Sequence, residues 1–468
     1  MLRKEENSRT QKEEFCVEDF VPKDHLLRKI EEAVDFNYIY ELVKDLYCEN
    51  NGRPGIDPVV LFKMVLIQHL YGITSLRRTV EEISMNVAYR WFLGYSMGEQ
   101  IPHFATISYN FRHRFTEEVT EQIFDWILRT IAEYGYLSPG AVFIDGTHMK
   151  ANASLKKKIK KEVPKAAKRY EQELRKEINE DREKQGKKPF SDDEQKPPKT
   201  KETTESTTDP ECGMFHKGEH RKCFAYTAQT ACDKYGYVLD FTLNSGDVHD
   251  STAFDELYAR LKEKFSEMHY IVMDCGFKTP WVYKQVLDDG HIPVLPYKRP
   301  MGKEGFFRPY EYVYDEYYDC VLCPENYVLP YSTTDREGYR QFKSKSYHCE
   351  KCPSRSKCTK SKKYQKVVTK HIWSDYLELA EDIRHTTGMK ELYALRKETI
   401  ERVFADAKEK YAMRYTLYRG LSQNKKWVRL KFAAMNLKKF AKHRWNDLHS
   451  SLFAFCFSLF SPLSFLPA

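Results

Sequence analysis

Residues 20–135 carry apolar side chains at three- and four-residue intervals, a spacing that predicts helices. The segments with this pattern read HLLRKIEEAV, YIYELVKDLY, PVVLFKMVLIQHLYG and LRRTVEEISMNVAYRWFLG. NGRPGIDP interrupts the pattern, and Asp57 before Pro58 is well placed to open a helix. PHFATISYNFRHRF predicts a turn and then a helix that starts near Thr106 or Ser108. These helices are either a scaffold or dimerisation module, or a helix-turn-helix-like DNA-binding module, which the Arg77, Arg78, Arg112 and Arg114 side chains would suit.

Short apolar runs replace the helical pattern after residue 140 and predict strands. They read AVFI, CFAYTAQTAC, YGYVLDFTLN, HYIVMD and HIPVLPY. We expect Asp145 to end the first run, with Gly146 allowing a sharp turn, and Asp274 to end HYIVMD. A helix follows SGDVHDS, where Ser251 or Asp250 would be the N-cap. The strongest later helix spans 391–413. Strands alternating with helices in this order predict an α/β unit around a mixed sheet.

Two stretches interrupt this unit. Residues 155–210 are very polar; their first half predicts a charged helix (156–185), and KPFSDDEQKPPKTKETTEST predicts disorder, so the stretch is a solvated linker or a basic track for DNA. Residues 300–370 are rich in Tyr and Cys. We therefore expect a helical N-terminal domain (1–135), an α/β domain (136–447) with both inserts, and an apolar tail (448–468).

The bulk composition narrows the class of protein. Charged residues make up 31% of the chain, and its start is charged, without the apolar region of a secretory signal. The apolar tail is shorter than the roughly 20 residues of a membrane span and contains Pro462 and Pro467. We expect a cytoplasmic, nucleoid-associated protein with no membrane partner. The net charge of +8 is compatible with a polyanionic partner without requiring one.

Asp145 and Asp274 follow apolar strands in the same way, and each has a glycine within two residues. Neighbouring strand ends can bring such side chains to one sheet edge, where Glu401 on a packed helix could join them. Three converging carboxylates suit hard divalent ions, which neutralise the entering and leaving oxygens of a phosphodiester. Taken singly, each residue is more often a turn residue or a solvated side chain.

Five cysteines crowd into residues 320–358. Cys320 and Cys323 form one CxxC pair, Cys349 and Cys352 form another, and Cys358 follows. Two such pairs about 25 residues apart fit a zinc-ribbon plan, in which four of the five thiolates hold a structural Zn²⁺. His348 or Cys358 could replace one ligand, and the alternative is a reduced, metal-free insert. Tyr327 and Tyr331 in this insert could contact DNA.

Several blocks together resemble bacterial insertion-sequence transposases of the DDE class. The blocks read IDGTHMKANAS, NSGDVHDSTAFD, VMDCGFKTP and IERVFADAKEKYAMRYTLYRG, and GRPGIDPVVLFKMVLIQHLYG with AYRWFLG resembles the InsH-like N-terminal module. The resemblance implies an RNase-H-like core in which Asp145, Asp274 and Glu401 bind two Mg²⁺ ions, with Mn²⁺ as a substitute. It also implies double-stranded DNA as substrate, cleaved and then joined without a covalent enzyme intermediate, and a homodimer that pairs two transposon ends.

The helix block also resembles a Tyr–Arg–Glu–Lys signature, here Tyr393, Arg396, Glu401 and Lys408, in which Tyr393, Arg396 and Lys408 would contact DNA. Lys408 keeps the expected spacing. Arg396 and Glu401 are five positions apart, with four residues between them, which is about 140° around a helix and puts Arg396 in doubt. The alternatives are another RNase-H-like nuclease, or a defective or domesticated transposase that binds DNA without cutting it. His249 and Asp250 in GDVHDS could lie near the active site, but the favoured interpretation is that Asp250 caps the helix that follows it.

Overall fold

The computed structural model describes residue 14 and residues 16–47, 55–164, 170–191, 200–217, 221–297 and 302–459. The first part of the chain is helical, as predicted. Asp57 accepts hydrogen bonds from the Val59 and Val60 amides and caps the helix that Pro58 begins, whereas His103 caps the helix expected to start at Thr106 or Ser108. The helices are α1 (Val17–Phe20), α2 (Leu26–Ala33), α3 (Tyr38–Val43), α4 (Pro58–Leu70), α5 (Leu76–Met85), α6 (Val87–Leu93), α7 (Phe104–Arg114) and α8 (Glu117–Glu133).

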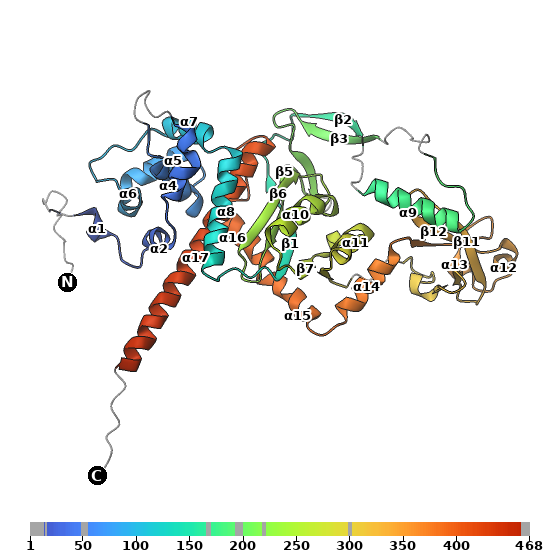
Figure 1. The fold of residues 1–468 in the computed structure, drawn as a ribbon. Helices are drawn as coiled ribbons and strands as arrows, with labels where there is room; N and C mark the ends of the chain where they lie inside the picture. Colours follow the sequence, from blue (N-terminus) through green and yellow to red (C-terminus); the bar gives the residue numbers. More distant parts are fainter. Residues whose placement is uncertain are drawn as a thin grey trace, which may run out of the picture.

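The C-terminal helix α17 (Leu421–Leu459) packs against α2, α4 and α8 and also against the central sheet. Figure 1 shows α8 and α17 between the N-terminal helices and the strands. The predicted apolar tail (448–468) begins within this helix, which ends at Leu459. The last residues, 460–468, lie outside the described residues. No helix in the described ranges is both long and apolar enough to cross a membrane.

A mixed sheet lies at the centre, as the α/β prediction required. Its strands run in the order β4–β5–β1–β7–β8, and β6 pairs with the same edge of β5 as β4 does. β1 is antiparallel to β5 and parallel to β7, which is parallel to β8. The bounds are β1 (Ala141–Lys150), β4 (Gly213–Lys217), β5 (Arg221–Cys232), β6 (Val238–Ser245), β7 (Tyr270–Met273) and β8 (Ile292–Val294).

Both faces of this sheet are buried, because neighbouring residues of β1 enter opposite cores. Val142 and Ile144 pack with α10 (Asp250–Lys264), α11 (Pro280–Asp288) and α14 (Ser374–Arg384). Phe143 lies on the other face, in one core with α16 (Ile400–Glu409), α17 and the N-terminal helices. The sheet is thus held rigidly between two layers, a suitable support for a site at its edge.

The two inserts fold against each other. Residues 313–371 of the second insert form a five-stranded sheet with two short helices, and α9 (Glu171–Lys184) from the first insert packs on β11. Figure 1 places α9 alongside β11 and β12, far from the N-terminal helices. The bounds are β9 (Val313–Asp315), β10 (Cys320–Leu322), β11 (Val328–Thr334), β12 (Tyr339–Lys343), α12 (Ser346–Glu350), α13 (Arg355–Cys358) and β13 (Val367–His371).

Three predicted segments differ from the structure. The charged helix over 156–185 is reduced to α9, because β2 (Lys158–Pro164) precedes it. Part of the segment predicted as disordered forms β3 (Thr200–Ser206), which pairs with β2. The single helix over 391–413 is broken into α15 (Met389–Ala394), a 3₁₀ turn (Leu395–Lys397) and α16.

Candidate active site

Asp145 lies within β1, at the point where its parallel partner ends. The ladder between β1 and β7 stops at Ile144 and Met273, while β1 continues beside β5 to Lys150. Asp145 therefore does not end the strand, and Gly146 makes no turn. A Cβ on Gly146 would lie 2.8 Å from both the Gln229 Nε2 and the Asp250 Oδ1, so a larger residue there would displace these two side chains.

Asp274 follows β7 directly, as predicted, and begins a short 3₁₀ turn (Cys275–Phe277). Its Oδ1 accepts a hydrogen bond of 2.7 Å from the Gly276 amide. A Cβ on Gly276 would lie 2.9 Å from that same oxygen and 3.3 Å from the Asp250 Oδ2. The two glycines therefore let three carboxylates from β1, α10 and the end of β7 approach one another.

Asp250 was expected to cap α10, and this expectation was wrong. The His249 side chain accepts from the Ser251 amide and is the N-cap, which leaves Asp250 as the first helical residue. The Gln229 side-chain amide of β5 donates to the Asp250 Oδ1. The sequence signal was present in GDVHDS, but histidine is not among the favoured N-cap residues.

The electrostatics reflect this crowding of acids. Burial raises the pKa of Asp145 to about 6; the Arg396 guanidinium opposes that rise, and the charges of Asp274 and Asp250 add to it. Burial also raises the pKa of Asp250. The hydrogen bond from Gln229 lowers this pKa, and the negative charge of Asp274 raises it. The cluster therefore favours a cation or a proton.

Arg396 supplies one such cation. Its Nη2 lies 2.5 Å from the Asp145 Oδ2, and only 4% of the side chain is exposed. Its Nε and Nη1 are buried and have no hydrogen-bond partner among the described residues. The doubt about Arg396 assumed one continuous helix, but the 3₁₀ turn and the Thr399 backbone (φ −105°, ψ −100°) separate it from α16 and turn it toward the sheet.

Glu401 and Lys408 occupy the first and last turns of α16, which packs on β1. Glu401 is exposed, whereas Val403, Phe404 and Ala407 face the core. Burial raises the pKa of Tyr393. The positive charge of Arg396 lowers this pKa, and the negative charges of Asp274 and Glu401 raise it. Tyr393 is thus close enough to both Asp274 and Glu401 for their charges to act on its hydroxyl.

The donor types fit a hard divalent ion, although the acids are not gathered closely around one point. Across the described ranges, no three His, Cys, Asp or Glu side chains are arranged to hold a metal ion. Yet the Gln229 Oε1 is a buried acceptor with no hydrogen-bond partner among the same residues, and it lies beside Gly146 and the Asp250 carboxylate. Carboxylate and amide oxygens are the ligands that Mg²⁺ and Ca²⁺ accept.

The predicted cysteine ligands separate into two groups. Burial raises the pKa of the Cys358 thiol, the hydroxyl of Tyr312 lowers it, and the Cys349 and Cys323 thiols raise it further. Cys320 is instead buried in β10, where Asp315 and Asp319 are its charged neighbours. The thiols near one another therefore come from the β10–β11 turn, α12 and α13, and Cys320 lies apart.

Comparisons with known families agree with this arrangement. The model of a transposase domain (DUF772) matches residues 15–114, which form the N-terminal helices α1–α7. The model of a transposase DDE domain matches residues 322–441, which include Arg396, Glu401 and Lys408. No solved structure matches the chain.

The matches define an enzyme of the DDE class, a polynucleotidyl transferase and endonuclease that works with divalent metal ions. Within that class the chain is an insertion-sequence transposase, and it binds DNA.

Proposed function

We propose that this transposase cleaves the terminal inverted repeats of its insertion sequence and joins the cut ends to target DNA, with Asp145, Asp274 and Glu401 as ligands of Mg²⁺. Bound ions, or Mn²⁺ in their place, supply charge neutralisation at the entering and leaving oxygens of the phosphodiester. The central support is that the Asp250 and Asp274 carboxylates approach each other at Gly276 and that both interact electrostatically with Asp145, in a sheet that is buried on both faces.

The chain's own residues prepare this edge. Gln229 orients the Asp250 carboxylate, and the Gly276 amide orients the Asp274 carboxylate. Arg396 compensates the Asp145 charge and must withdraw from it before that oxygen can serve another cation. Glu401 is exposed in the first turn of α16, and Lys408 in the last turn of that helix is suited to a phosphate. Tyr393 and Arg396 would border the bound strand.

The test uses the full chain and DNA that carries both terminal repeats from its own insertion sequence. Strand cleavage and joining are followed on gels in Mg²⁺ and in Mn²⁺. Asp145→Asn, Asp274→Asn and Glu401→Gln should each lower both activities by about 10²-fold or more, because losing a metal ligand removes charge stabilisation in the transition state. Glu398→Gln is the control, since Glu398 is exposed and lies three residues before Glu401. Wild-type activity in Asp145→Asn would overturn the assignment.

A structural Zn²⁺ in the second insert belongs to the same proposal, with Cys323, Cys349, Cys352 and Cys358 as its ligands. Its support is the proximity of the Cys358, Cys349 and Cys323 thiols. Atomic absorption of protein purified without chelator should give one zinc per chain. Cys349→Ser should lose it and Cys320→Ser should keep it; zinc absent from the wild type would refute the site.

We further propose that a homodimer pairs two DNA ends. Light scattering after gel filtration should show a complex of two chains and two end fragments. A complex that contains one chain at saturating DNA would contradict it.

A further inference from the structure

The strongest unassigned feature is a groove of about 530 Å³ on the second insert. Its walls come from β11, from the end of β12, from the loop that leads into α12, and from Lys187 just after α9. Arg182 of α9 holds this wall in place by donating to the Thr333 Oγ1 at 3.0 Å and to the Thr334 carbonyl at 2.8 Å. The Ser344 hydroxyl on the floor accepts from the Lys366 amide at 2.8 Å.

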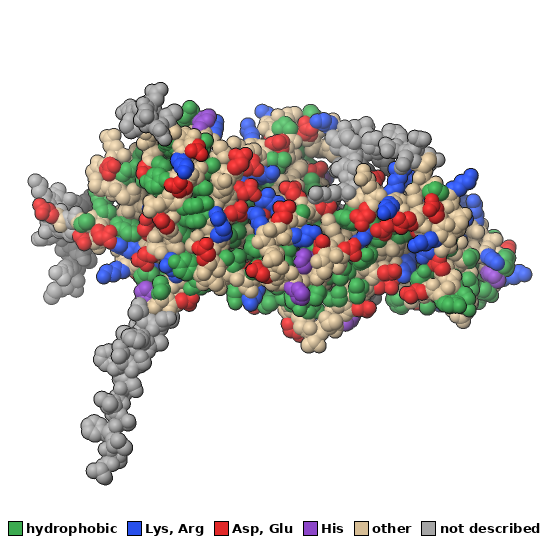
Figure 2. Space-filling view, viewed as in Figure 1, with side chains coloured by type: hydrophobic (Ala, Val, Ile, Leu, Met, Phe, Trp, Pro, Cys, Tyr) green, Lys and Arg blue, Asp and Glu red, His purple; other side chains and the backbone are tan. Residues whose placement is uncertain are grey.

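The groove is basic. Lys187, Lys343 and Lys345 line it, together with serine and tyrosine hydroxyls, and none of its lining residues is acidic. No ion pair of these three lysines occurs among the described residues, whereas Arg340 and Lys370 of the same insert are both paired with acids. Figure 2 shows lysine and arginine side chains at this end of the molecule. The charge of the groove is thus available to an external anion.

Aromatic rings lie beside the lysines. Tyr347 lines the groove and is 57% exposed, and its ring centroid lies 4.2 Å from that of His348. His348 in turn stacks on Tyr327 at 4.5 Å. Exposed rings next to a positively charged groove are the combination that binds single-stranded nucleic acid, because bases stack on the rings while lysines follow the phosphates.

We propose that this groove binds single-stranded DNA, with Lys343 and Lys345 on the phosphates and Tyr347 under a base. The bases of a duplex are already paired and stacked on one another, so only an unpaired strand offers a base face to Tyr347. The proposal rests on the proposed function for the identity of the nucleic acid, but it assigns a second contact with DNA, on the insert. The strand held there would be one that is unpaired near a transposon end.

The test is fluorescence anisotropy of the full chain with a labelled 12-nucleotide mixed-sequence strand and with the duplex of the same sequence, in EDTA so that no cleavage occurs. Lys343→Ala/Lys345→Ala should weaken strand binding about tenfold or more. It should also reduce the slope of log affinity against log salt by about 1.4, at roughly 0.7 per lost phosphate contact. Tyr347→Ala should weaken binding about tenfold with little change in that slope.

The control is Lys303→Ala/Lys360→Ala, which removes two exposed lysines of the same insert that do not line the groove. Equal loss of affinity in both double variants, or an unchanged affinity in Lys343→Ala/Lys345→Ala, would overturn the proposal. The proposal would also be overturned if the groove variants weakened binding of the single strand and of the duplex equally. Asp145→Asn separates the two proposals, because it should bind the strand as the wild type does even though it does not cleave.

Discussion

Asp250 changes the composition of the acidic cluster at the scale of single residues. Its carboxylate lies near the Asp274 carboxylate, because both would contact a Cβ placed on Gly276. The buried Gln229 side-chain amide fixes the orientation of the Asp250 carboxylate. Residues that orient metal ligands commonly contribute 10- to 100-fold to metal affinity. Asp250 and Gln229 therefore belong with the predicted ligands in any experiment on this site.

Asp250→Asn is expected to lower the affinity for Mn²⁺ about tenfold, because it removes one negative charge from the cluster. Titration calorimetry on the full chain measures this directly. Asp247→Asn is the matched control. Asp247 lies in the loop before α10, and its carboxylate accepts a hydrogen bond from the hydroxyl of Ser245 at the end of β6. An equal loss of affinity in both variants would show that the effect is general electrostatics and not a contact within the cluster.

A buried lysine makes a second residue-scale prediction. Lys431 of α17 is 2% exposed and donates to the Tyr411 carbonyl, and burial lowers its pKa to about 7. Between pH 7 and about 10 the unfolded chain holds a proton that the folded chain has released, so this lysine makes stability rise with pH. Below pH 7 both states are protonated and its contribution is constant.

Lys431→Met removes this dependence. The free energy of unfolding of the variant minus that of the wild type should fall as pH rises from 7 to 10, by at most about 1.4 kcal/mol per unit. Urea denaturation at several pH values gives the difference. A difference that is independent of pH would mean that Lys431 stays protonated in the folded protein.

At the scale of elements, hydrophobic pattern predicted the segments whose side chains enter a core. α4, β5, β6 and β7 lie where the sequence placed them, because their apolar residues are buried on a sheet face or between helices. β2 and β3 were missed because most residues of the ladder between them are Lys, Glu and Thr, with cross-strand ion pairs such as Lys160–Glu202 at 2.6 Å. The break before α16 depends on backbone angles that no residue type announces.

The acidic cluster likewise contains residues that local pattern could identify and residues that it could not. Asp274 was predictable because it follows an apolar strand, and Gly276 beside it marks the close approach. Asp250 was not, because its role depends on contact with Gln229, which lies 21 residues away in the sequence. The contact of Arg396 with Asp145 could be predicted only if the break in the helix between Ala394 and Ile400 were known. Local pattern identifies candidate groups, and only tertiary contacts decide their partners.

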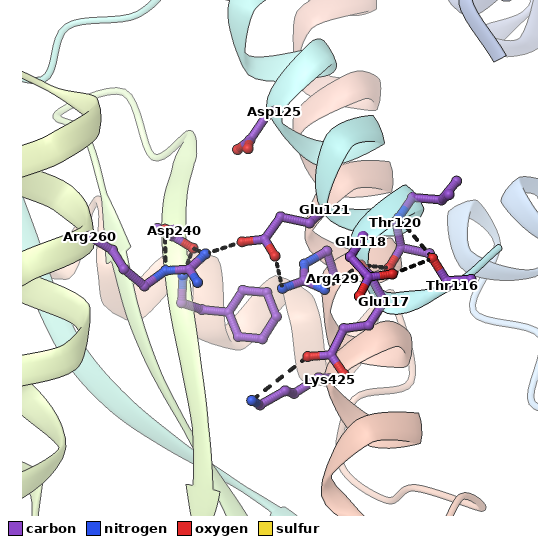
Figure 3. A network of polar contacts seen from close by, with 12 residues as sticks. Thr116, Glu117, Glu118, Thr120, Glu121, Asp125, Asp240, Arg260, Lys425 and Arg429 are labelled. Atoms are coloured by element: carbon purple, nitrogen blue, oxygen red, sulfur yellow. Dashed lines mark hydrogen bonds and ion pairs between the residues drawn. The ribbon is translucent and has the colours of Figure 1, made fainter. Parts of the chain in front are cut away.

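Ion pairs join α8, α10, β6 and α17. Arg260 of α10 lies 2.9 Å from the buried Asp240 of β6 and 2.5 Å from Glu121 of α8, and Glu121 also pairs with Arg429 of α17 at 3.4 Å (Figure 3). Because Asp240 is 2% exposed, removal of its partner leaves a poorly compensated charge.

Arg260→Gln should therefore lower the free energy of unfolding by about 2 kcal/mol, less than for a fully buried pair because Arg260 is partly exposed. Chemical denaturation measures the change. Glu263→Gln on the exposed side of the same helix should change stability by less than about 0.5 kcal/mol. A similar small effect of Arg260→Gln would show that Lys264, which lies 3.2 Å from Asp240, compensates fully.

At the scale of the whole molecule, segments far apart in the sequence share one structure. α17 completes the core of the N-terminal helices, and α9 packs on a sheet that begins more than a hundred residues later. Leu174 and Ile178 of α9 form a small buried cluster with Trp373. Gly338, at φ +85° in the β11–β12 turn, approaches so closely that a Cβ there would lie 3.0 Å from the Leu174 Cδ1.

Leu174→Asp tests whether α9 supports the second insert. Burying a carboxylate there without a partner should detach α9, so amide exchange in β11–β13 should accelerate at least tenfold. Exchange in β1, β5 and β7 should stay as in the wild type, because the central sheet has its own two cores. Gln172→Asp introduces the same residue on the exposed side of α9 and should change neither region. If Leu174→Asp accelerated exchange in both sheets alike, the insert and the catalytic core would be a single cooperative unit. If it accelerated neither, α9 would be dispensable to the sheet that it covers.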